Sequence, residues 1–292
     1  MRIAIIGAGR MGKWFAELFL EQGFKVIVSD KDREKLQRLK DKLNIEIADN
    51  VRATESADRI LICVPIDNFE DVIREISPHI RPGQEIMDIC SIKEIPVDIM
   101  HKYIGNAVTL GTHPMFGPGA KRVKGQNFIL TPTNADEEAL AIDFARWLKS
   151  LGANVFFMTP KEHDKIMSIV IGLPYFLSHV LCDTLLSYGA FERAKKVSGI
   201  SYKLLLTLTE AVVSEETELA ASIQIKLPDV DKLGKLLIEK ASEWLGVVER
   251  KEKTELVGKI ILLKNRLARH DPQYFKAYKY MYKMIGNIKD DC

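Results

Sequence analysis

The chain has 292 residues, of which 47% are hydrophobic and 28% charged, and its 42 basic and 40 acidic side chains leave a formal net charge of +2. This length is sufficient for two domains with a large core, and the balanced charge gives no basis for a nucleic-acid-binding surface. Its cysteines show no CxxC pairing and no metal-ligand spacing, so we expect no metal site and a reducing, cytoplasmic setting. They are Cys63, Cys90, Cys182 and Cys292.

The sequence also gives no sign of secretion or of a membrane span. Its first residues, "MRIAIIGAG", predict a strand and a turn rather than a signal peptide. We find no apolar run of the ~18–20 residues that a membrane span needs. The longest candidate, residues 166–186, contains Pro174, His179 and Asp183, and we interpret it as a buried core helix.

The first 160 residues alternate short apolar runs with amphipathic ones. This alternation predicts an α/β fold with a doubly wound, mostly parallel sheet, and we assign residues 1–160 to a dinucleotide-binding domain. The predicted strands cover residues 2–7, 25–30, 59–65, 85–91, 107–113, 127–132 and 154–159, and the predicted helices cover residues 10–23, 32–43, 68–80 and 137–152.

The pattern becomes purely helical after Thr159. Pro160 suits the first turn of a long helix, and the remaining helical segments are expected to break at Gly199, Pro228, Gly246 and Pro272. We therefore predict an all-helical second domain over residues 161–292. Apolar stripes at residues 236–248 and 255–267 exceed what a small domain can bury by itself, so we predict a homodimer through this domain.

A glycine-rich motif, "GAGRMG", follows the first strand and opens the first helix. In this context GxGxxG is typical of a turn that binds a dinucleotide pyrophosphate at a helix N-terminus. Gly7 permits the tight turn, Gly9 lets the backbone approach the cofactor, and Gly12 permits close packing of helix on strand. A glycine turn without a cofactor is the alternative. We expect the whole loop, including Arg10 and Met11, to contact the cofactor.

Further features indicate which dinucleotide is bound. Asp30, at the end of the second strand, suits the ribose hydroxyls of NAD and would repel a 2′-phosphate. The neighbouring cations Lys31 and Arg33 leave NADP open. We expect Val64 and Pro65, after another strand, to lie near the nicotinamide.

A histidine ends a further strand, in "GTHPMFGPG". Ligands of such folds bind at the carboxyl ends of the strands, where both Ser91 and His113 are expected. Pro114 and the nearby glycines shape a rigid loop around His113, which suits a general base working near neutral pH. We expect Ser91 to hold this imidazole or the reacting hydroxyl. A histidine that merely caps a turn is the alternative.

With "DICSIKE" and the GxGxxG start, "GTHPMFGP" resembles the prephenate dehydrogenase family. The segment "TPKEHDKIM", residues 159–167, also resembles the start of that family's helical dimerisation domain. The resemblance covers residues 1–190 well and the rest loosely. It implies oxidative decarboxylation of prephenate to 4-hydroxyphenylpyruvate, in which His113 takes the proton of the ring hydroxyl and NAD takes the hydride. Ser91 and Lys93 match the serine and lysine of the family motif.

The helical domain departs from the family pattern at the substrate site. A histidine is usual where this chain has Tyr175, and a carboxylate-binding arginine is usual near Ala211. A dianionic substrate still needs cations, because an unpaired buried carboxylate is costly. Lys203 is our candidate, with Tyr175 also assigned to the substrate. The other weighed residues are Arg193, Lys195 and Lys196 as cations and His179 as the substitute histidine.

These departures keep alternatives open. One is a paralogue that binds the cofactor, has lost the usual substrate site and serves as a nucleotide-binding or regulatory partner. Another is a dehydrogenase of arogenate or of another small acid, because a fold does not fix a function. We interpret His163 as structural and assign no part to His79, His101 and His270.

Overall fold

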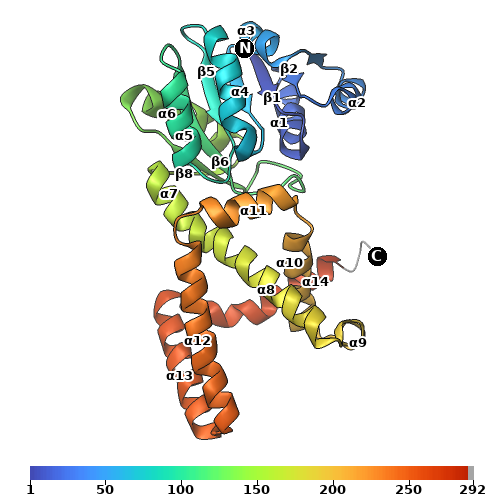
Figure 1. Ribbon diagram of the computed structural model, residues 1–292, viewed down its shortest axis with the longest axis vertical. Helices are drawn as coiled ribbons and strands as arrows, with labels where there is room; N and C mark the ends of the chain where they lie inside the picture. The colour runs from blue at the N-terminus through green and yellow to red at the C-terminus, as the bar shows by residue number, and fades with distance from the viewer. Residues whose placement is uncertain (289–292) are drawn as a thin grey trace. The chain divides into compact units, whose positions relative to one another are not determined.

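The computed structural model describes residues 1–288 (Figure 1). Cys292, one of the cysteines expected to be reduced, lies outside the described residues. The chain divides into two compact units. The first contains Met1–Met167 and Ala221–Pro228, and the second contains Ser168–Ala220 and the chain from Asp229 onward.

The first unit is built on a single sheet, in which the described residues form eight strands in the order β3-β2-β1-β4-β5-β6-β7-β8. The strands from β1 to β6 are parallel, and β7 and β8 run in the opposite direction. This confirms the predicted doubly wound, mostly parallel sheet. The strands are β1 (Arg2–Ile6), β2 (Lys25–Ser29), β3 (Glu46–Ile47), β4 (Arg59–Ile62), β5 (Glu85–Asp88), β6 (Val108–Pro114), β7 (Asn127–Thr131) and β8 (Asn154–Phe157).

Helices cover both faces of this sheet (Figure 1), because the strands are apolar on both faces. On one face α1 (Arg10–Glu21), α2 (Arg33–Leu43) and α6 (Ala135–Ser150) bury their apolar sides in one core cluster. On the other face α3 (Asn50–Ser56), α4 (Phe69–Ile76) and α5 (Glu94–Tyr103) bury theirs in a second cluster.

A segment distant in the sequence returns to this first unit. The second half of α11 (Thr217–Lys226) lies against the loop that follows β4, where Lys226 Nζ is 2.7 Å from the carboxylate of Asp67. Ser222 donates a hydrogen bond to the same carboxylate. This contact explains why residues 221–228 group with the sheet rather than with the other helices.

The second unit is helical, as predicted. Its α12 (Val230–Arg250) and α13 (Lys253–His270) are joined by a short turn and form a hairpin (Figure 1). A π-helical segment, Ser168–Gly172, joins α7 (Pro160–Met167) of the first unit to α8. The helices of the second unit are α8 (Leu173–Tyr188), α9 (Phe191–Lys196), α10 (Ile200–Val213), the start of α11, α12 (Val230–Arg250), α13 (Lys253–His270) and α14 (Ala277–Ile288).

Two expectations for the helices are wrong. Gly246 does not break a helix but lies inside α12, which ends at Arg250 and is followed by Lys251 in the left-handed region with φ of 56°. A helix tolerates one interior glycine at a cost of ~1 kcal/mol.

The other wrong expectation concerns the long helix Pro160–Tyr188. By length and composition it is apolar enough to cross a membrane, and only 11% of its most apolar window is buried. It is therefore not a buried core helix of this chain. Its exposed apolar residues include Ile169, Val170, Leu177 and Val180.

Candidate active site

The glycine-rich turn after β1 has the conformation that its residues were expected to permit. Gly7 has φ of +109°, and a Cβ there would lie 2.5 Å from the carbonyl oxygen of Cys63. A Cβ on Gly12 would lie 1.9 Å from the carbonyl oxygen of Gly7. A Cβ on Gly9 would meet no atom within 4 Å, so the backbone there is open to the approach of a ligand. The turn therefore fits a bound pyrophosphate.

Asp30 helps to hold this turn in place. Its carboxylate accepts hydrogen bonds from the backbone N–H of Ala8, at 2.6 Å, and of Asp32, at 2.8 Å. The first of these bonds joins the end of β2 to the glycine turn after β1. The other cofactor residues stay predictions: Arg10 is exposed at the start of α1, Met11 and Val64 are half-buried, and Pro65 is exposed.

The histidine of "GTHPM" lies at the same edge of the sheet. β5 and β6 are parallel neighbours, with Asp88 opposite Gly111, so Ser91 and His113 both follow at the carboxyl edge. The side chain of Ser91 is half-buried and that of His113 is only 4% exposed. Among the described residues, Ser91 makes no hydrogen bond to this imidazole, and its expected part stays a prediction.

The partner of His113 is instead His163, which sequence reasoning treated as structural. Nδ1 of His113 lies 2.8 Å from Nε2 of His163, and Nδ1 of His163 lies 2.7 Å from the carboxylate of Asp164. All three side chains are buried. Their only sequence signal was an adjacent His-Asp pair in the first turns of a helix, with nothing to indicate that it would meet a residue 50 positions earlier.

Asp164 also joins α7 to α5. Its two carboxylate oxygens accept hydrogen bonds from the backbone N–H of Lys93, at 2.6 Å, and of Glu94, at 2.9 Å. These N–H groups are unpaired within α5 because they begin it, and a carboxylate at that end also interacts favourably with the helix dipole. The orientation of Asp164, and through it that of His163, is therefore fixed by the start of α5.

Lys93 is completely buried beneath the same cluster. Its ammonium forms an ion pair with Asp88, whose carboxylate also accepts the N–H of Cys90 at 2.7 Å. The lysine stem passes over Gly111, where a Cβ would lie 3.2 Å from Lys93 Cδ and 2.2 Å from Thr131 Oγ1. The predicted contact of Lys93 with a substrate stays a prediction, and in this structure its charge is matched by Asp88.

The electrostatic surroundings keep both imidazoles neutral. Burial holds the pKa of His113 well below its ordinary value, and the electrostatic influence of His163 and of the Lys93 ammonium lowers it further. Burial also lowers the pKa of His163, although the hydrogen bond to Asp164 acts in the opposite direction. Near neutral pH, His113 is therefore an uncharged imidazole that can accept a proton.

The second unit holds the other predicted substrate residues. Tyr175 and His179 are half-buried one turn apart on α8, with ring centroids 6.4 Å apart and nearly perpendicular. Lys203 is exposed near the start of α10. Of the other cations considered, Lys195 is paired with Glu210 at 2.9 Å. The substrate contacts of Tyr175 and Lys203 remain predictions.

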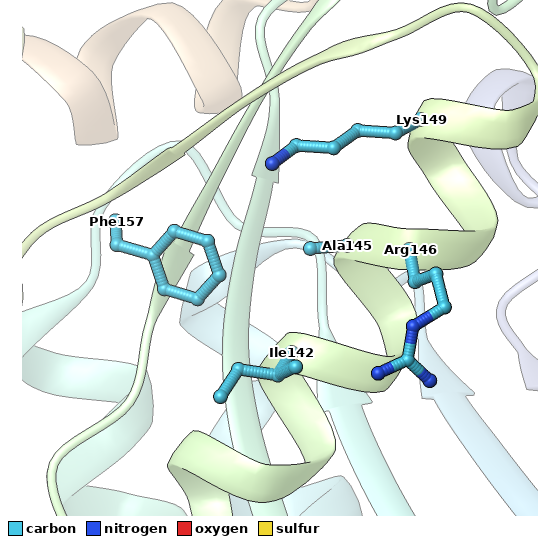
Figure 2. A pocket seen from close by; sticks show the side chains of 5 residues that line it. All are labelled: Ile142, Ala145, Arg146, Lys149 and Phe157. Carbon is cyan, nitrogen blue, oxygen red and sulfur yellow. The ribbon is translucent and has the colours of Figure 1, made fainter.

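A shallow hollow elsewhere in the first unit has no histidine or carboxylate in its lining. It lies between α6 and β8 (Figure 2) and contains none of the predicted site residues. Its lining consists of apolar side chains and two cations: Ile142, Ala145, Arg146, Lys149 and Phe157. The buried pair of His113 and His163 is therefore not part of this hollow.

Comparison with known families agrees with this geometry. Residues 15–157 match the family described as prephenate dehydrogenase, nucleotide-binding domain, and residues 159–262 match the family described as prephenate dehydrogenase, dimerization domain. Together the two matches include every predicted site residue from Asp30 to Lys203.

Individual proteins show the same similarity. A probable arogenate/prephenate dehydrogenase of Methanocaldococcus jannaschii is 34% identical over 262 residues, which cover 88% of this chain and 59% of that relative. The chain thus spans less than two thirds of that relative's length. Prephenate dehydrogenase from A. aeolicus, solved with hydroxyphenyl propionate and NAD+, has the same fold with a TM-score of 0.77 at 21% identity, covering 93% of this chain and 98% of that one. Synechocystis arogenate dehydrogenase gives a TM-score of 0.72 at 17% identity, covering 92% of this chain and 100% of that one.

Proposed function

This chain belongs to the prephenate dehydrogenase family, and from that premise we propose that it catalyses the NAD-dependent oxidative decarboxylation of prephenate to 4-hydroxyphenylpyruvate, a step of tyrosine biosynthesis. The observation that carries the proposal is the buried, neutral His113 at the same sheet edge as the open glycine turn. A general base and a dinucleotide turn at one edge are the parts that a dehydrogenase of a hydroxyl group requires.

Each residue has a defined part in this proposal. The N–H groups of the Gly7–Gly12 turn and the carboxylate of Asp30 would hold NAD, which supplies the hydride acceptor. His113 accepts the proton of the ring 4-hydroxyl, so that the O–H electron pair forms the carbonyl bond as that carbon gives up its hydride. Loss of the ring carboxylate as CO₂ then gives the aromatic ring. Ser91 is proposed to orient the hydroxyl.

The substrate itself is less closely defined. Arogenate is the second candidate, because the relatives include enzymes named for either substrate. Tyr175 and Ala211 stand where the family resemblance leads us to expect a histidine and an arginine. We propose that Lys203 contributes the cation that binds a substrate carboxylate.

The experiment is an absorbance assay for NADH or NADPH, with prephenate or arogenate offered in turn to the purified chain with either cofactor. We expect reduction of NAD with prephenate. Reduction with arogenate alone would replace the substrate. No reduction in any combination, with NAD binding intact by calorimetry, would favour the paralogue that has lost its substrate site.

One variant tests the base directly. We expect His113→Asn to retain NAD affinity and to lose turnover by at least about 100-fold, because a positioned base contributes that much. Near-normal turnover would refute this assignment. His79→Asn is the matched control, because His79 is a surface imidazole paired with Glu55 at 3.0 Å.

We also propose a cytoplasmic homodimer that associates through the helical unit. Support comes from the match of residues 159–262 to a dimerization domain and from the exposed apolar side chains of α8, α12 and α13.

A further inference from the structure

The hydrogen bonds around Asp164 determine where the protons of its neighbours lie. Its carboxylate accepts two backbone N–H groups at the start of α5, so it faces its third neighbour as an acceptor as well. That neighbour is Nδ1 of His163, at 2.7 Å. Nδ1 of His163 must therefore carry a hydrogen.

The same argument continues to His113. A neutral imidazole with a hydrogen on Nδ1 has an unprotonated Nε2, which can only accept. Nε2 of His163 lies 2.8 Å from Nδ1 of His113, so Nδ1 of His113 must carry a hydrogen and donate it. The remaining nitrogen of His113, Nε2, is then left with a lone pair.

We propose that His163 and Asp164 are positioning residues that fix the tautomer of His113, so that its Nε2 is the basic atom. The catalytic part of this inference rests on the proposed function, in which His113 is the base. We call Asp164, His163 and His113 the relay. It runs from the start of α5 through α7 to the end of β6, and all three of its side chains are buried.

The relay also keeps its hydrogen bonds when His113 accepts a proton. Once protonated at Nε2, His113 is a cation that still donates from Nδ1 to His163. His163 in turn stays hydrogen-bonded to a carboxylate. The arrangement follows the logic of a catalytic triad, in which a buried carboxylate orients the imidazole without taking its proton, but here a second imidazole stands between them.

Matched substitutions at His163 test the relay. Asparagine can reproduce only the Nδ1 position of the ring, whereas the longer glutamine side chain places an oxygen near the Nε2 position. We expect His163→Asn to lower kcat at least about tenfold with little change in KM, and His163→Gln to recover part of that loss. Asp164→Leu removes the oxygen that accepts from Nδ1 of His163, so it should release the tautomer and lower kcat in the same way.

A measurement that needs no turnover accompanies the assay. Nitrogen NMR of the protein labelled at histidine reports which ring nitrogen is protonated, and His113→Asn identifies the signals of His113. We expect wild-type His113 near neutral pH to carry its hydrogen on Nδ1 and to lose this preference in His163→Asn. Circular dichroism of each variant shows whether the fold is retained.

The outcomes separate the relay from the function. A wild-type His113 protonated on Nε2, or an unchanged kcat in a folded His163→Asn, would overturn the relay. Wild-type protein that shows the Nδ1–H tautomer but turns over none of the substrates would remove the proposed function and support the relay. His79→Asn should change neither the His113 signals nor kcat.

Discussion

His113 and His163 are buried as neutral imidazoles, and this affects stability as well as chemistry. Burial holds the pKa of both below the value of about 6.5 that applies in the unfolded chain. As pH falls below about 6.5, the unfolded state therefore binds protons that the folded state does not. Stability contributed by the neutral rings is present above that pH and is lost below it.

We accordingly expect the Tm to fall as the pH is lowered from about 7 to about 5, with each group contributing at most about 1.4 kcal/mol per pH unit. The charged groups that influence this pair are Lys93, which lowers both pKa values, and Asp164 and Asp88, which raise that of His163. Calorimetric scans across this range provide the measurement. A folded His113→Asn variant should have a shallower slope, and an equal slope would contradict the argument.

The ion pair of Lys93 and Asp88 gives a second prediction. Both side chains are completely buried, and Oδ1 of Asp88 has no hydrogen-bond partner among the described residues. Lys93→Met would leave a buried carboxylate without its cation, so we expect a loss of about 3–5 kcal/mol in unfolding free energy, measured by urea denaturation.

The double variant Lys93→Met/Asp88→Asn is the control, because it removes both charges. It should recover part of the lost stability. Lys93→Met could instead unfold like the wild type and only raise the KM for prephenate. That result would mean that the ammonium contacts the substrate, and that Lys93 leaves its buried ion pair with Asp88 when the substrate binds.

Substitutions in the glycine turn after β1 test whether NAD binds at its open face. Gly9→Ala adds a methyl group where no atom lies within 4 Å, and its φ of −64° suits any residue. We expect it to fold with an unchanged Tm but to lose at least about tenfold in NAD affinity, because the methyl group occupies the approach of the pyrophosphate.

Gly12→Ala is the contrasting variant. Its methyl group would lie 1.9 Å from the carbonyl oxygen of Gly7, inside the turn itself, so we expect a lower Tm as well as weaker NAD binding. Calorimetric titration with NAD and thermal scans of both variants make the comparison. Unchanged NAD affinity in Gly9→Ala would show that the open face of the turn is not where the dinucleotide lies.

The elements also show how far the sequence could be interpreted. The mostly parallel sheet, the glycine turn and the position of His113 at a strand end followed from apolar runs and local motifs. The helix α5 was missed because its own first residues supply no cap: the side chain that accepts its N-terminal N–H groups is Asp164, about 70 residues later. β3 was missed because it has only two residues.

The same reason explains the part of the site that was not foreseen. His163 acquires its contact with His113 from the packing of α7 against α5, and no local pattern indicates a contact of that sequence separation. A His-Asp pair at a helix start fits a surface cap equally well. Only the folded chain distinguishes the two.

At the scale of the whole molecule, hydropathy failed to distinguish a buried core helix from a helix with an exposed apolar surface. The helix Pro160–Tyr188 is as apolar as a core helix, yet Leu177 and Val180 on α8 are 41% and 46% exposed. Large exposed apolar surfaces of this kind are typical of subunit interfaces. We therefore expect light scattering at micromolar concentration to give the mass of a dimer.

Charges introduced into the apolar surface of α8 by substitution test which surface forms the dimer. We expect Leu177→Asp/Val180→Asp to raise the dimer dissociation constant at least about 100-fold, because each carboxylate would be buried without a partner. Ile142→Asp is the control, since Ile142 is an equally exposed apolar residue, at 48%, on α6 of the sheet unit. A monomeric wild type, or one that sediments with lipid vesicles, would contradict the dimer, and a dimer weakened only by Ile142→Asp would place the interface on the sheet unit instead.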